Sequence, residues 1–283
     1  MSDVPERPFR FGICLFTPVE RDDWVKKVKL AEELGFDVVS VSDHLGMPAP
    51  LPTLVLAAEA TERIRIGTLV LNTTFYQPTV LARDIATIDR YAGGRVEVGL
   101  GAGYDRSQFD AAGLPWTSAA ERVAHLERTV DRLKAEPGPP VMIAGRGDRV
   151  LRLAAEKADV IAFTGTTRVR RDGDGLRLGG LAEISDRVEF VRGLLGPRAG
   201  QVELNIPIHR VLPPGGGHGV TDVWQNDLDL TTDQLVELPS VLVGTPEECA
   251  EQLYAARQRF GISYFSVLEP EMSAFARVIE VLR

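Results

Sequence analysis

The chain alternates short apolar runs with longer segments in which apolar residues recur every three or four positions. Residues 21–36 show the second pattern, because their apolar side chains fall on one helical face and Gly35 suits a helix stop. That face consists of Trp24, Val28, Ala31 and Leu34. Further predicted helices occupy residues 51–63, 78–94, 117–135, 148–158, 184–195, 246–260 and 271–282. Apolar runs of strand length lie at residues 9–16, 37–44, 64–72, 95–103, 140–145, 159–165, 202–212 and 262–269.

The alternation of these segments predicts the architecture. Strands that alternate with helices along a chain pair in a parallel sheet. Eight such units in 283 residues fit a closed (β/α)8 barrel, with an open doubly wound sheet as the alternative. We therefore predict a single α/β barrel domain over residues 1–283. In such a barrel the functional groups lie at the carboxyl ends of the strands.

Two segments interrupt the alternation, after the predicted strands six and seven. Residues 164–181 place Asp-Gly turn signals between two short runs, which predicts a small hairpin. Residues 213–240 are rich in glycine and then acidic. Both segments follow strands on the rim where barrel loops form binding sites. Each is therefore either a cover for a ligand or a tolerated surface insertion.

The predicted strand ends carry the residues from which a site would be built. They are Asp43-His44, Leu69-Val70 with Asn72, Gly101-Ala102-Gly103-Tyr104, Gly145-Arg146-Gly147, Thr164-Gly165 and Glu269. A lone histidine near a strand end is commonly structural, but the neighbouring Asp43 favours ligand contact for His44. Glycines allow a flat ring or a phosphate to approach the backbone, and a helix N-terminus attracts anions. Neither glycine run is a full GxGxxG fingerprint.

Several other kinds of catalytic site are absent from the sequence. The four histidines lack metal-ligand spacing and there is no HExxH or CxxC motif, so we predict no metal site. No predicted strand contains a lysine, which argues against a Schiff-base aldolase. Glu97 is a charged residue in an otherwise apolar run, and we predict a polar contact inside the barrel for it.

Composition narrows the partners and the location. A net charge of −8 and a pI near 5.2 argue against duplex nucleic acid as a partner, because such binding needs a basic surface. Cys14 and Cys249 lie in apolar settings, which predicts buried thiols in a reducing compartment. No apolar run approaches the length of a bilayer span, and the first ten residues are polar. We therefore expect a cytoplasmic protein without a membrane partner.

Four segments, in this order along the chain, resemble the bacterial luciferase-like superfamily of flavin and deazaflavin oxidoreductases. They are LAEELGFDVVSVSDH, RIRIGTLVLNTTFYQPTVLARDIATIDRYAGGRVEVGLGAGY, PVMIAGRG and VLVGTPEECAEQLYAARQRFGISYFSV. The second is the most specific, because a strand, a helix begun by proline and a glycine-rich strand all match. The SDH at the end of the first segment resembles the branch that uses the 8-hydroxy-5-deazaflavin coenzyme F420. FMN-dependent monooxygenases share much of the rest.

The resemblance implies roles for residues at three strand ends. Asp43 would contact the polar edge of the deazaflavin ring, and His44 would lie by its redox face and exchange a proton. Leu69-Val70 matches the position of a non-prolyl cis peptide that bulges against the ring in deazaflavin-dependent members. Tyr104 would serve as a proton donor or a stacking surface, with a purely packing role as the alternative.

Two turns match the remaining cofactor contacts of the family. The turn that lines the cofactor's chain comprises Gly101, Gly103, Tyr104 and Ser107. The turn that binds its phosphate comprises Gly145, Arg146 and Gly147. A poly-glutamate tail on the coenzyme would then lie near the mouth, where basic side chains would screen it. The basic residues in question are Arg106, Arg149, Arg168, Arg170 and Arg171.

The resemblance also implies a reaction. In an F420-dependent oxidoreductase the coenzyme carries a hydride to or from a small organic substrate, and the protein positions and desolvates it. The alternatives are an FMN-dependent monooxygenase with a separate reductase partner and a cofactor-binding member without turnover. Family members commonly form homodimers through the helices that flank strands two and three. Residues 53–60 and 79–88 are apolar enough to permit that arrangement.

Two positions depart from the family's sugar-phosphate dehydrogenases. Those enzymes have Trp shortly after Asp-His, where this chain has Pro48. They have Glu directly after the glycine-rich turn, where this chain has Tyr104. Both differences argue against a sugar phosphate as the substrate.

Overall fold

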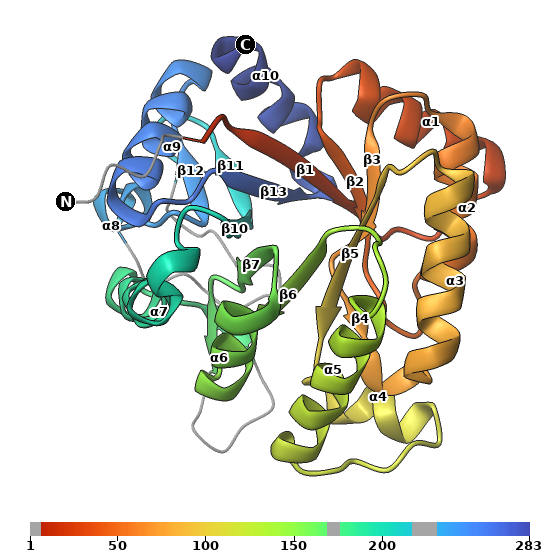
Figure 1. Ribbon diagram of the computed structural model, residues 1–283. Coiled ribbons are helices and arrows are strands. Elements are labelled where there is room, and N and C mark those ends of the chain that lie inside the picture. The colour runs from red at the N-terminus through yellow and green to blue at the C-terminus, as the bar shows by residue number, and fades with distance from the viewer. Residues whose placement is uncertain (1–6, 169–175, 217–230) are drawn as a thin grey trace.

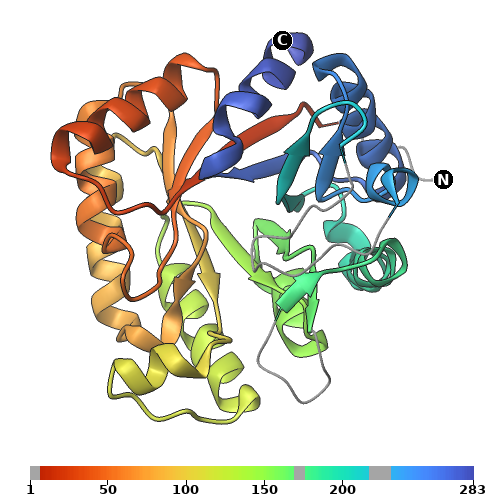
Figure 2. The ribbon, with the colours of Figure 1, turned by 180° about the vertical axis from the view of Figure 1, so that it is seen from behind.

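The computed structural model describes residues 7–168, 176–216 and 231–283. Its parallel strands form a closed ring in the order β3, β2, β1, β13, β10, β7, β6 and β5, and β5 pairs back to β3 (Figure 1). Helices surround this ring, as the view from behind also shows (Figure 2). The structure thus confirms the predicted (β/α)8 barrel.

The elements have the following bounds. The strands are β1 (Arg10–Leu15), β2 (Val38–Val41), β3 (Arg65–Thr68), β4 (Leu71–Asn72), β5 (Val96–Gly101), β6 (Val141–Gly145), β7 (Val160–Phe163), β8 (Thr166–Arg168), β9 (Leu176–Leu178), β10 (Glu203–Ile208), β11 (Arg210–Leu212), β12 (Val241–Val243) and β13 (Tyr264–Leu268). The α-helices are α1 (Arg21–Glu33), α2 (Pro50–Ala60), α3 (Pro78–Tyr91), α4 (Arg106–Ala111), α5 (Ala119–Leu133), α6 (Asp148–Lys157), α7 (Leu181–Leu195), α8 (Thr232–Val236), α9 (Pro246–Phe260) and α10 (Met272–Leu282). Short 3-10 turns are η1 (Thr73–Phe75), η2 (Gly196–Arg198) and η3 (Glu269–Glu271).

Two predicted strands are divided in the structure. The run 64–72 splits into β3 and β4 around Leu69 and Val70, which are joined by a cis peptide bond. The run 202–212 splits into β10 and β11, because β11 leaves the ring and pairs with β12. Sequence reasoning missed β12 as a strand, and it missed α4 and α8, which are too short for a helical period to be visible.

The first predicted insertion is confirmed as a hairpin. β8 and β9 pair in antiparallel fashion, with Thr166 opposite Leu178. Its Asp-Gly turn, within residues 169–175, lies outside the described residues. Of the second insertion, residues 217–230 lie outside the described residues, and the remainder includes α8.

The inside of the ring holds an apolar cluster that is separate from the larger core. A small inner cluster is formed by Val38, Met142, Val160, Ala162 and Tyr264. Leu69, Val70 and Ala144 pack on this cluster from the carboxyl side and are half-buried. The outward side chains of the strands join a larger core with the helices. In α1, Trp24, Val28 and Ala31 are buried as predicted, and Leu34 is half-buried.

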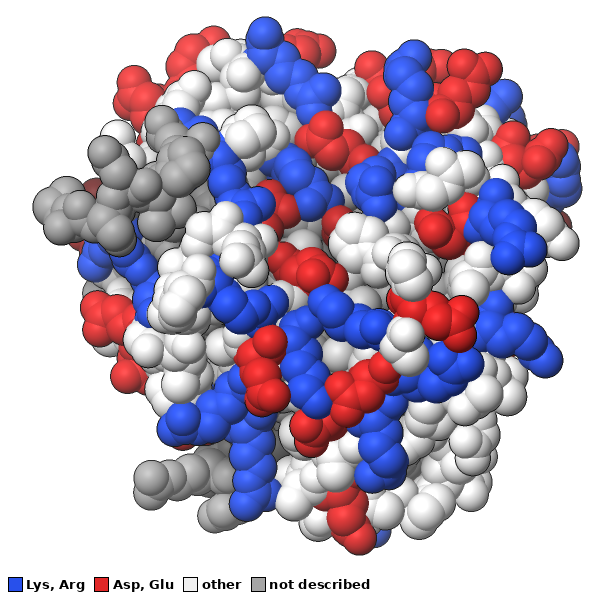
Figure 3. Space-filling model, viewed as in Figure 1, with Lys and Arg blue, Asp and Glu red and all other residues white. Residues whose placement is uncertain are grey.

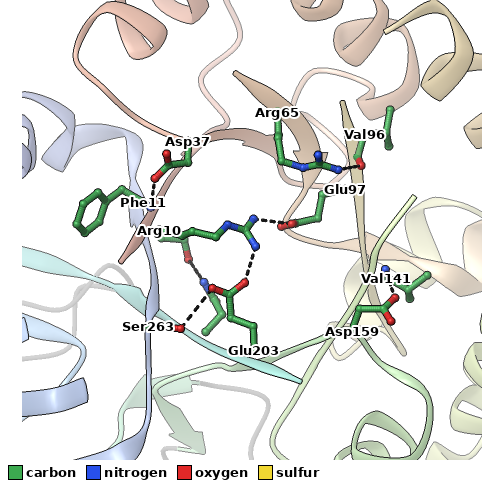
Figure 4. A network of polar contacts seen from close by, with 12 residues as sticks. Arg10, Phe11, Asp37, Arg65, Val96, Glu97, Val141, Asp159, Glu203 and Ser263 are labelled. Atoms are coloured by element: carbon green, nitrogen blue, oxygen red, sulfur yellow. Dashed lines mark hydrogen bonds and ion pairs between the residues drawn. The ribbon is translucent and has the colours of Figure 1, made fainter. Parts of the chain in front are cut away.

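A charged network fills the amino end of the ring (Figure 4). The Arg10 guanidinium forms ion pairs with Glu97, at 2.6 Å, and with Glu203. It also lies 4.3 Å from the centre of the Tyr264 ring. The two carboxylates are nearly inaccessible, with side-chain exposures of 4% and 7%. This arrangement confirms the polar contact predicted for Glu97 and gives both buried charges a partner.

The surface and the thiols agree with the composition. Lys and Arg side chains are interspersed with Asp and Glu on the face shown in Figure 3. Cys14 and Cys249 are both buried, as predicted, and burial raises the pKa of each thiol to about 11. Among the described residues, no helix is long and apolar enough to cross a membrane.

We expect Arg10→Ala to lower the free energy of unfolding by about 3–5 kcal/mol at pH 8, because it leaves two buried carboxylates without their cation. Burial raises the pKa of Glu203 and Arg10 opposes that rise, so removing Arg10 raises this pKa further. The loss should therefore shrink at pH 5, where more of the carboxyl is protonated. Urea denaturation at both pH values measures the effect. Arg21→Ala, an exposed matched control, should cost less than about 0.5 kcal/mol; equal losses in the two variants would contradict the prediction.

Candidate functional site

The floor of the barrel mouth is formed at the carboxyl ends of β3 and β6. Leu69, Val70 and Ala144 cover the inner cluster there and remain half-exposed. The Leu69-Val70 peptide is cis, as the family resemblance implied. The Ser42 hydroxyl donates a hydrogen bond of 3.3 Å to the Leu69 carbonyl oxygen and so ties this peptide to the end of β2. The result is a small apolar surface at the base of the mouth.

His44 and Tyr104 lie together at the rim. Their ring centroids are 5.9 Å apart in an edge-to-face arrangement with an interplanar angle of 72°. The His44 ring nitrogens form no hydrogen bond to any residue within the described ranges, so they are available to a ligand. Tyr104 is 49% exposed, and its pKa is raised by burial and by the nearby Asp105 carboxylate. Its hydroxyl therefore stays protonated at neutral pH and acts as a donor.

Asp43 is held by a backbone donor from the segment that follows β3. Its Oδ2 accepts a hydrogen bond of 3.0 Å from the Asn72 backbone N–H. Burial raises the pKa of Asp43, while the Asn72 N–H, the Tyr76 side chain and His44 act in the opposite direction. A ligand contact would use the remaining acceptor capacity of the carboxylate.

The glycines of the first turn serve internal packing. A Cβ atom at Gly101 would lie 2.9 Å from Val70 Cγ2. At Gly103, where φ is +75°, a Cβ would lie 2.6 Å from Asn72 Oδ1 and 2.8 Å from the Phe109 ring. Both positions require glycine because neighbouring atoms of the protein occupy the space that a Cβ atom would need. This requirement is independent of any cofactor ring. The explanation offered from sequence for their lack of a side chain was therefore incomplete.

The second turn has one open glycine. A Cβ at Gly145 would meet Val150 Cγ1 at 2.5 Å, whereas at Gly147 no atom lies within 4 Å. Gly147 is the N-cap of α6, so the first backbone N–H groups of this helix lack intrahelical acceptors. Arg146 between them is half-buried. This turn retains the geometry that an anionic group needs.

Ser107 has a local partner. Its backbone N–H and its hydroxyl both donate to Asp105 Oδ1, at 2.9 and 2.6 Å, where Asp105 is the N-cap of α4. The Leu45 N–H donates to Gln108 Oε1 at 2.7 Å, which fastens the loop after His44 to the same helix. Ser107 therefore shapes the rim, and a cofactor contact by its hydroxyl stays a prediction.

The predicted basic cluster is only partly described. Arg106 and Arg149 are exposed, and Arg106 lies 3.7 Å from Asp110. The side chain of Arg168, and Arg170 and Arg171 altogether, lie outside the described residues. Glu269, another strand-end residue, accepts hydrogen bonds of 2.8 Å from the Phe16 and Thr17 N–H groups and pairs with Lys27. It is thus occupied in joining β13 to the neighbouring strand and helix.

Sequence reasoning missed three residues that organise the rim. Tyr76 lowers the pKa of Asp43, and His125 and Arg122 of α5 hold the loops behind it. His125 Nε2 lies 3.0 Å from the Thr73 carbonyl oxygen and 3.1 Å from that of Tyr76. The sequence carries one faint signal, since Arg122 and His125 are polar residues three positions apart on an amphipathic helix.

A separate cavity of about 600 Å³ lies away from the mouth, between α8, β12 and α9. Its apolar lining includes Val236, Leu238, Val243, Ala256 and Phe260. None of the predicted site residues contributes to it. In the described part of the chain, no cluster of three or more His, Cys, Asp or Glu side chains has metal-binding geometry. We therefore base the candidate site on the mouth.

The mouth combines apolar and polar groups. It offers an apolar floor, the imidazole of His44, acceptor and donor groups on Asp43 and Tyr104, and the N-terminus of α6 at Gly147. A closed (β/α)8 barrel with polar side chains at its carboxyl face is an architecture typical of enzymes.

Residues 9–174 match the model of the luciferase-like monooxygenase family, so the chain belongs to that family. It is 42% identical over 115 residues to an F420-dependent glucose-6-phosphate dehydrogenase of Beutenbergia cavernae. The aligned segment covers 38% of this chain and 34% of the relative. It is 30% identical over 171 residues to a 5,10-methylenetetrahydromethanopterin reductase of Archaeoglobus fulgidus. This aligned segment covers 53% of this chain and 51% of the relative. The matches thus span about a third to a half of the length of these curated relatives.

Solved structures share the fold over almost the entire chain. An F420-dependent secondary alcohol dehydrogenase in complex with an F420-acetone adduct superimposes with a TM-score of 0.73 and 16% identity, covering 98% of this chain and 100% of that one. An EDTA monooxygenase from Chelativorans sp. BNC1 superimposes with a TM-score of 0.71 and 12% sequence identity. The match covers 98% of this chain and 94% of that one. At these identities the likeness concerns the fold alone.

Gly103→Ala should lower the free energy of unfolding by at least about 1 kcal/mol, because it forces alanine into a left-handed conformation and against Asn72 and Phe109. Gly147→Ala is the matched control: with φ at −74° and open space it should change stability by less than about 0.5 kcal/mol. Urea denaturation of both variants tests the pair. A Gly147→Ala loss as large as that of Gly103→Ala would show that the two turns are misassigned.

Proposed function

We propose that this protein is an oxidoreductase that uses coenzyme F420 to transfer a hydride to or from a small organic substrate. The observation that carries the proposal is the pairing of an apolar floor, formed by Leu69 and Val70, with His44, whose ring nitrogens bond to none of the described residues, at its edge. A flat ring needs the first, and proton exchange needs the second. The names of the F420-dependent glucose-6-phosphate dehydrogenases among the relatives support the choice of coenzyme.

In this proposal each residue of the mouth has a separate role. When bound, the coenzyme supplies the hydride chemistry. Leu69 and Val70 support the ring and exclude water from one of its faces, and Asp43 accepts a hydrogen bond from its polar edge. His44 takes or gives the substrate proton through a ring nitrogen, since an imidazole can act as acid or base near neutral pH. Tyr104 donates a hydrogen bond from its hydroxyl beside His44.

The remaining cofactor contacts in the proposal come from the two turns. Gly101, Gly103 and Ser107 would line the chain of the coenzyme. Gly145, Arg146 and Gly147 would hold its phosphate, which the open N-terminus of α6 at Gly147 supports. We also propose a homodimer in the cytoplasm; Val55 on α2 and Val80 on α3, 43% and 46% exposed, support a contact through those helices.

The substrate of this proposal is not a sugar phosphate. Several matching relatives are named F420-dependent glucose-6-phosphate dehydrogenases, but each match covers less than half of the relative. Tyr104 stands where that group has Glu, and here it contacts the catalytic candidate His44 edge to face. With an aromatic side chain in place of that Glu, we favour a substrate without a phosphate, such as an alcohol or a carbonyl compound.

The second candidate is an FMN-dependent monooxygenase that receives reduced flavin from a reductase. The family description and structural neighbours such as the EDTA monooxygenase favour it. A family member that binds a cofactor without turnover is the third reading.

Purified protein should bind F420 at least tenfold more tightly than FMN, because the mouth resembles that of deazaflavin-dependent members. Titration with each cofactor, followed by the change in its fluorescence, gives both dissociation constants. Tight FMN binding with none for F420 would replace the proposal with the monooxygenase, and failure of both cofactors to bind would favour a member without turnover.

His44→Gln should keep F420 affinity within about threefold and lower turnover by about 10²–10⁴-fold, the usual contribution of a positioned acid or base. The assay follows F420 absorbance in single turnover with an alcohol or carbonyl substrate found by screening. Tyr91→Phe, 74% exposed on α3, serves as the control and should keep wild-type rates. Wild-type turnover in His44→Gln would remove His44 from the mechanism.

A further inference from the structure

Two loops meet at one side of the mouth although their strands are not neighbours in the ring. His44 follows β2 and Tyr104 follows β5, and β3 lies between these strands because it pairs with both. The two rings are in edge-to-face contact, with centroids 5.9 Å apart. This contact therefore spans the carboxyl end of β3, where Leu69 forms part of the floor.

The loop after β2 is held through both polar groups of one peptide. The carbonyl oxygen of the peptide that joins His44 to Leu45 accepts from the Met47 N–H at 3.0 Å, which closes a turn. The N–H of the same peptide donates to Gln108 Oε1 at 2.7 Å. Because a peptide is planar, these two hydrogen bonds fix its orientation and so restrict the direction in which the His44 side chain leaves the backbone.

Gln108 belongs to a helix that is anchored in the core. The next residue along α4, Phe109, is buried and packs edge to face on Trp116, with ring centroids 4.8 Å apart. The Arg122 guanidinium lies 3.7 Å from the centre of the Trp116 ring and donates through Nε to the Gly103 carbonyl oxygen. The helix α4 and the turn before it are thus fixed to α5.

We infer that Gln108 is a positioning residue for His44, which it keeps against the Tyr104 ring. It acts through the Leu45 N–H, because none of the described contacts joins its side chain to the imidazole or to the floor. Its effect on turnover rests on the proposed function, whereas its effect on the position of His44 does not. The competing role is a loop contact that only stabilises the protein, and breaking such a contact would leave the two rings together.

The test compares three variants of the protein without cofactor. Gln108→Met keeps the size of the side chain but has no oxygen that accepts from Leu45. Gln108→Glu keeps the acceptor, and Asp110→Ala breaks an exposed ion pair on the same helix. The nuclear Overhauser effect between the ring protons of His44 and Tyr104 reports their contact, and hydrogen exchange reports the state of the Leu45 amide.

We expect the Overhauser effect to be lost in Gln108→Met, because the loop loses its hydrogen bond to α4, and to be kept in Gln108→Glu and Asp110→Ala. The Leu45 amide should exchange about two to ten times faster in Gln108→Met alone, the weight of one hydrogen bond. The inference is overturned if Gln108→Met keeps the Overhauser effect, or if either of the other two variants also loses it.

Kinetics supply the link to the proposed function. Gln108→Met should keep F420 affinity within about threefold and lower the single-turnover rate by about ten- to a hundredfold, as misplacement of a reacting group does. Gln108→Glu should keep wild-type values. If the wild-type protein binds no F420 but the Overhauser effect behaves as expected, the proposed function fails and the inference stands. If the effect is lost in Gln108→Met while turnover is unchanged, the orientation of His44 does not matter for the reaction, and the positioning role is overturned.

Discussion

The rest of the structure depends on how the inside of a closed barrel is filled. An eight-stranded ring must pack its interior with side chains, and here one end carries buried charges. Arg10 satisfies Glu97 and Glu203 at once and lies over the Tyr264 ring. With the amino end closed in this way, small residues suffice toward the carboxyl end, where Ala144 and Ala162 stand in the ring. Leu69 and Val70 pack on this end of the ring together with Ala144 and form the floor of the mouth.

The two ends of the barrel also differ in the side chains that connect neighbouring segments of the chain. At the amino end, carboxylates bind the first backbone N–H groups of neighbouring strands: Asp37 accepts from Phe11 and Asp159 from Val141, both at 2.8 Å (Figure 4). At the carboxyl end the corresponding contacts come from side chains of α5 and of the η1 segment. Arg122 Nε donates to the Gly103 carbonyl oxygen at 3.3 Å, one helical turn from His125. One helix thereby positions both loops that bring Tyr76 and Tyr104 to the rim.

The sequence predicted the parts of this arrangement that depend on local pattern. The faces of the helices and the eight strand runs follow from periodicity, so Trp24 and Val28 were identified as buried without the structure. The division of the run 64–72 and the departure of β11 from the ring depend on pairing between distant strands, which no local pattern encodes. Asp43 and His44 were found because they end a strand. Tyr76 was not, because its effect on the pKa of Asp43 arises only when the η1 turn folds back across the rim.

The two ends of the barrel also differ in how completely their polar groups are used, and this difference points to the site. Buried polar groups in proteins are almost always paired, so a polar side chain left without a partner at a rim is a candidate for ligand contact. Arg10, Glu97 and Glu203 satisfy one another, and Glu269 is occupied by Lys27 and two backbone donors. His44 has no such commitment to any described residue, although its neighbour Asp43 accepts a hydrogen bond from the Asn72 N–H. In the proposed function, a carboxylate held in place beside an imidazole without a described partner would suit proton exchange at a bound ring, since the carboxylate must stay in place while the imidazole changes its protonation state.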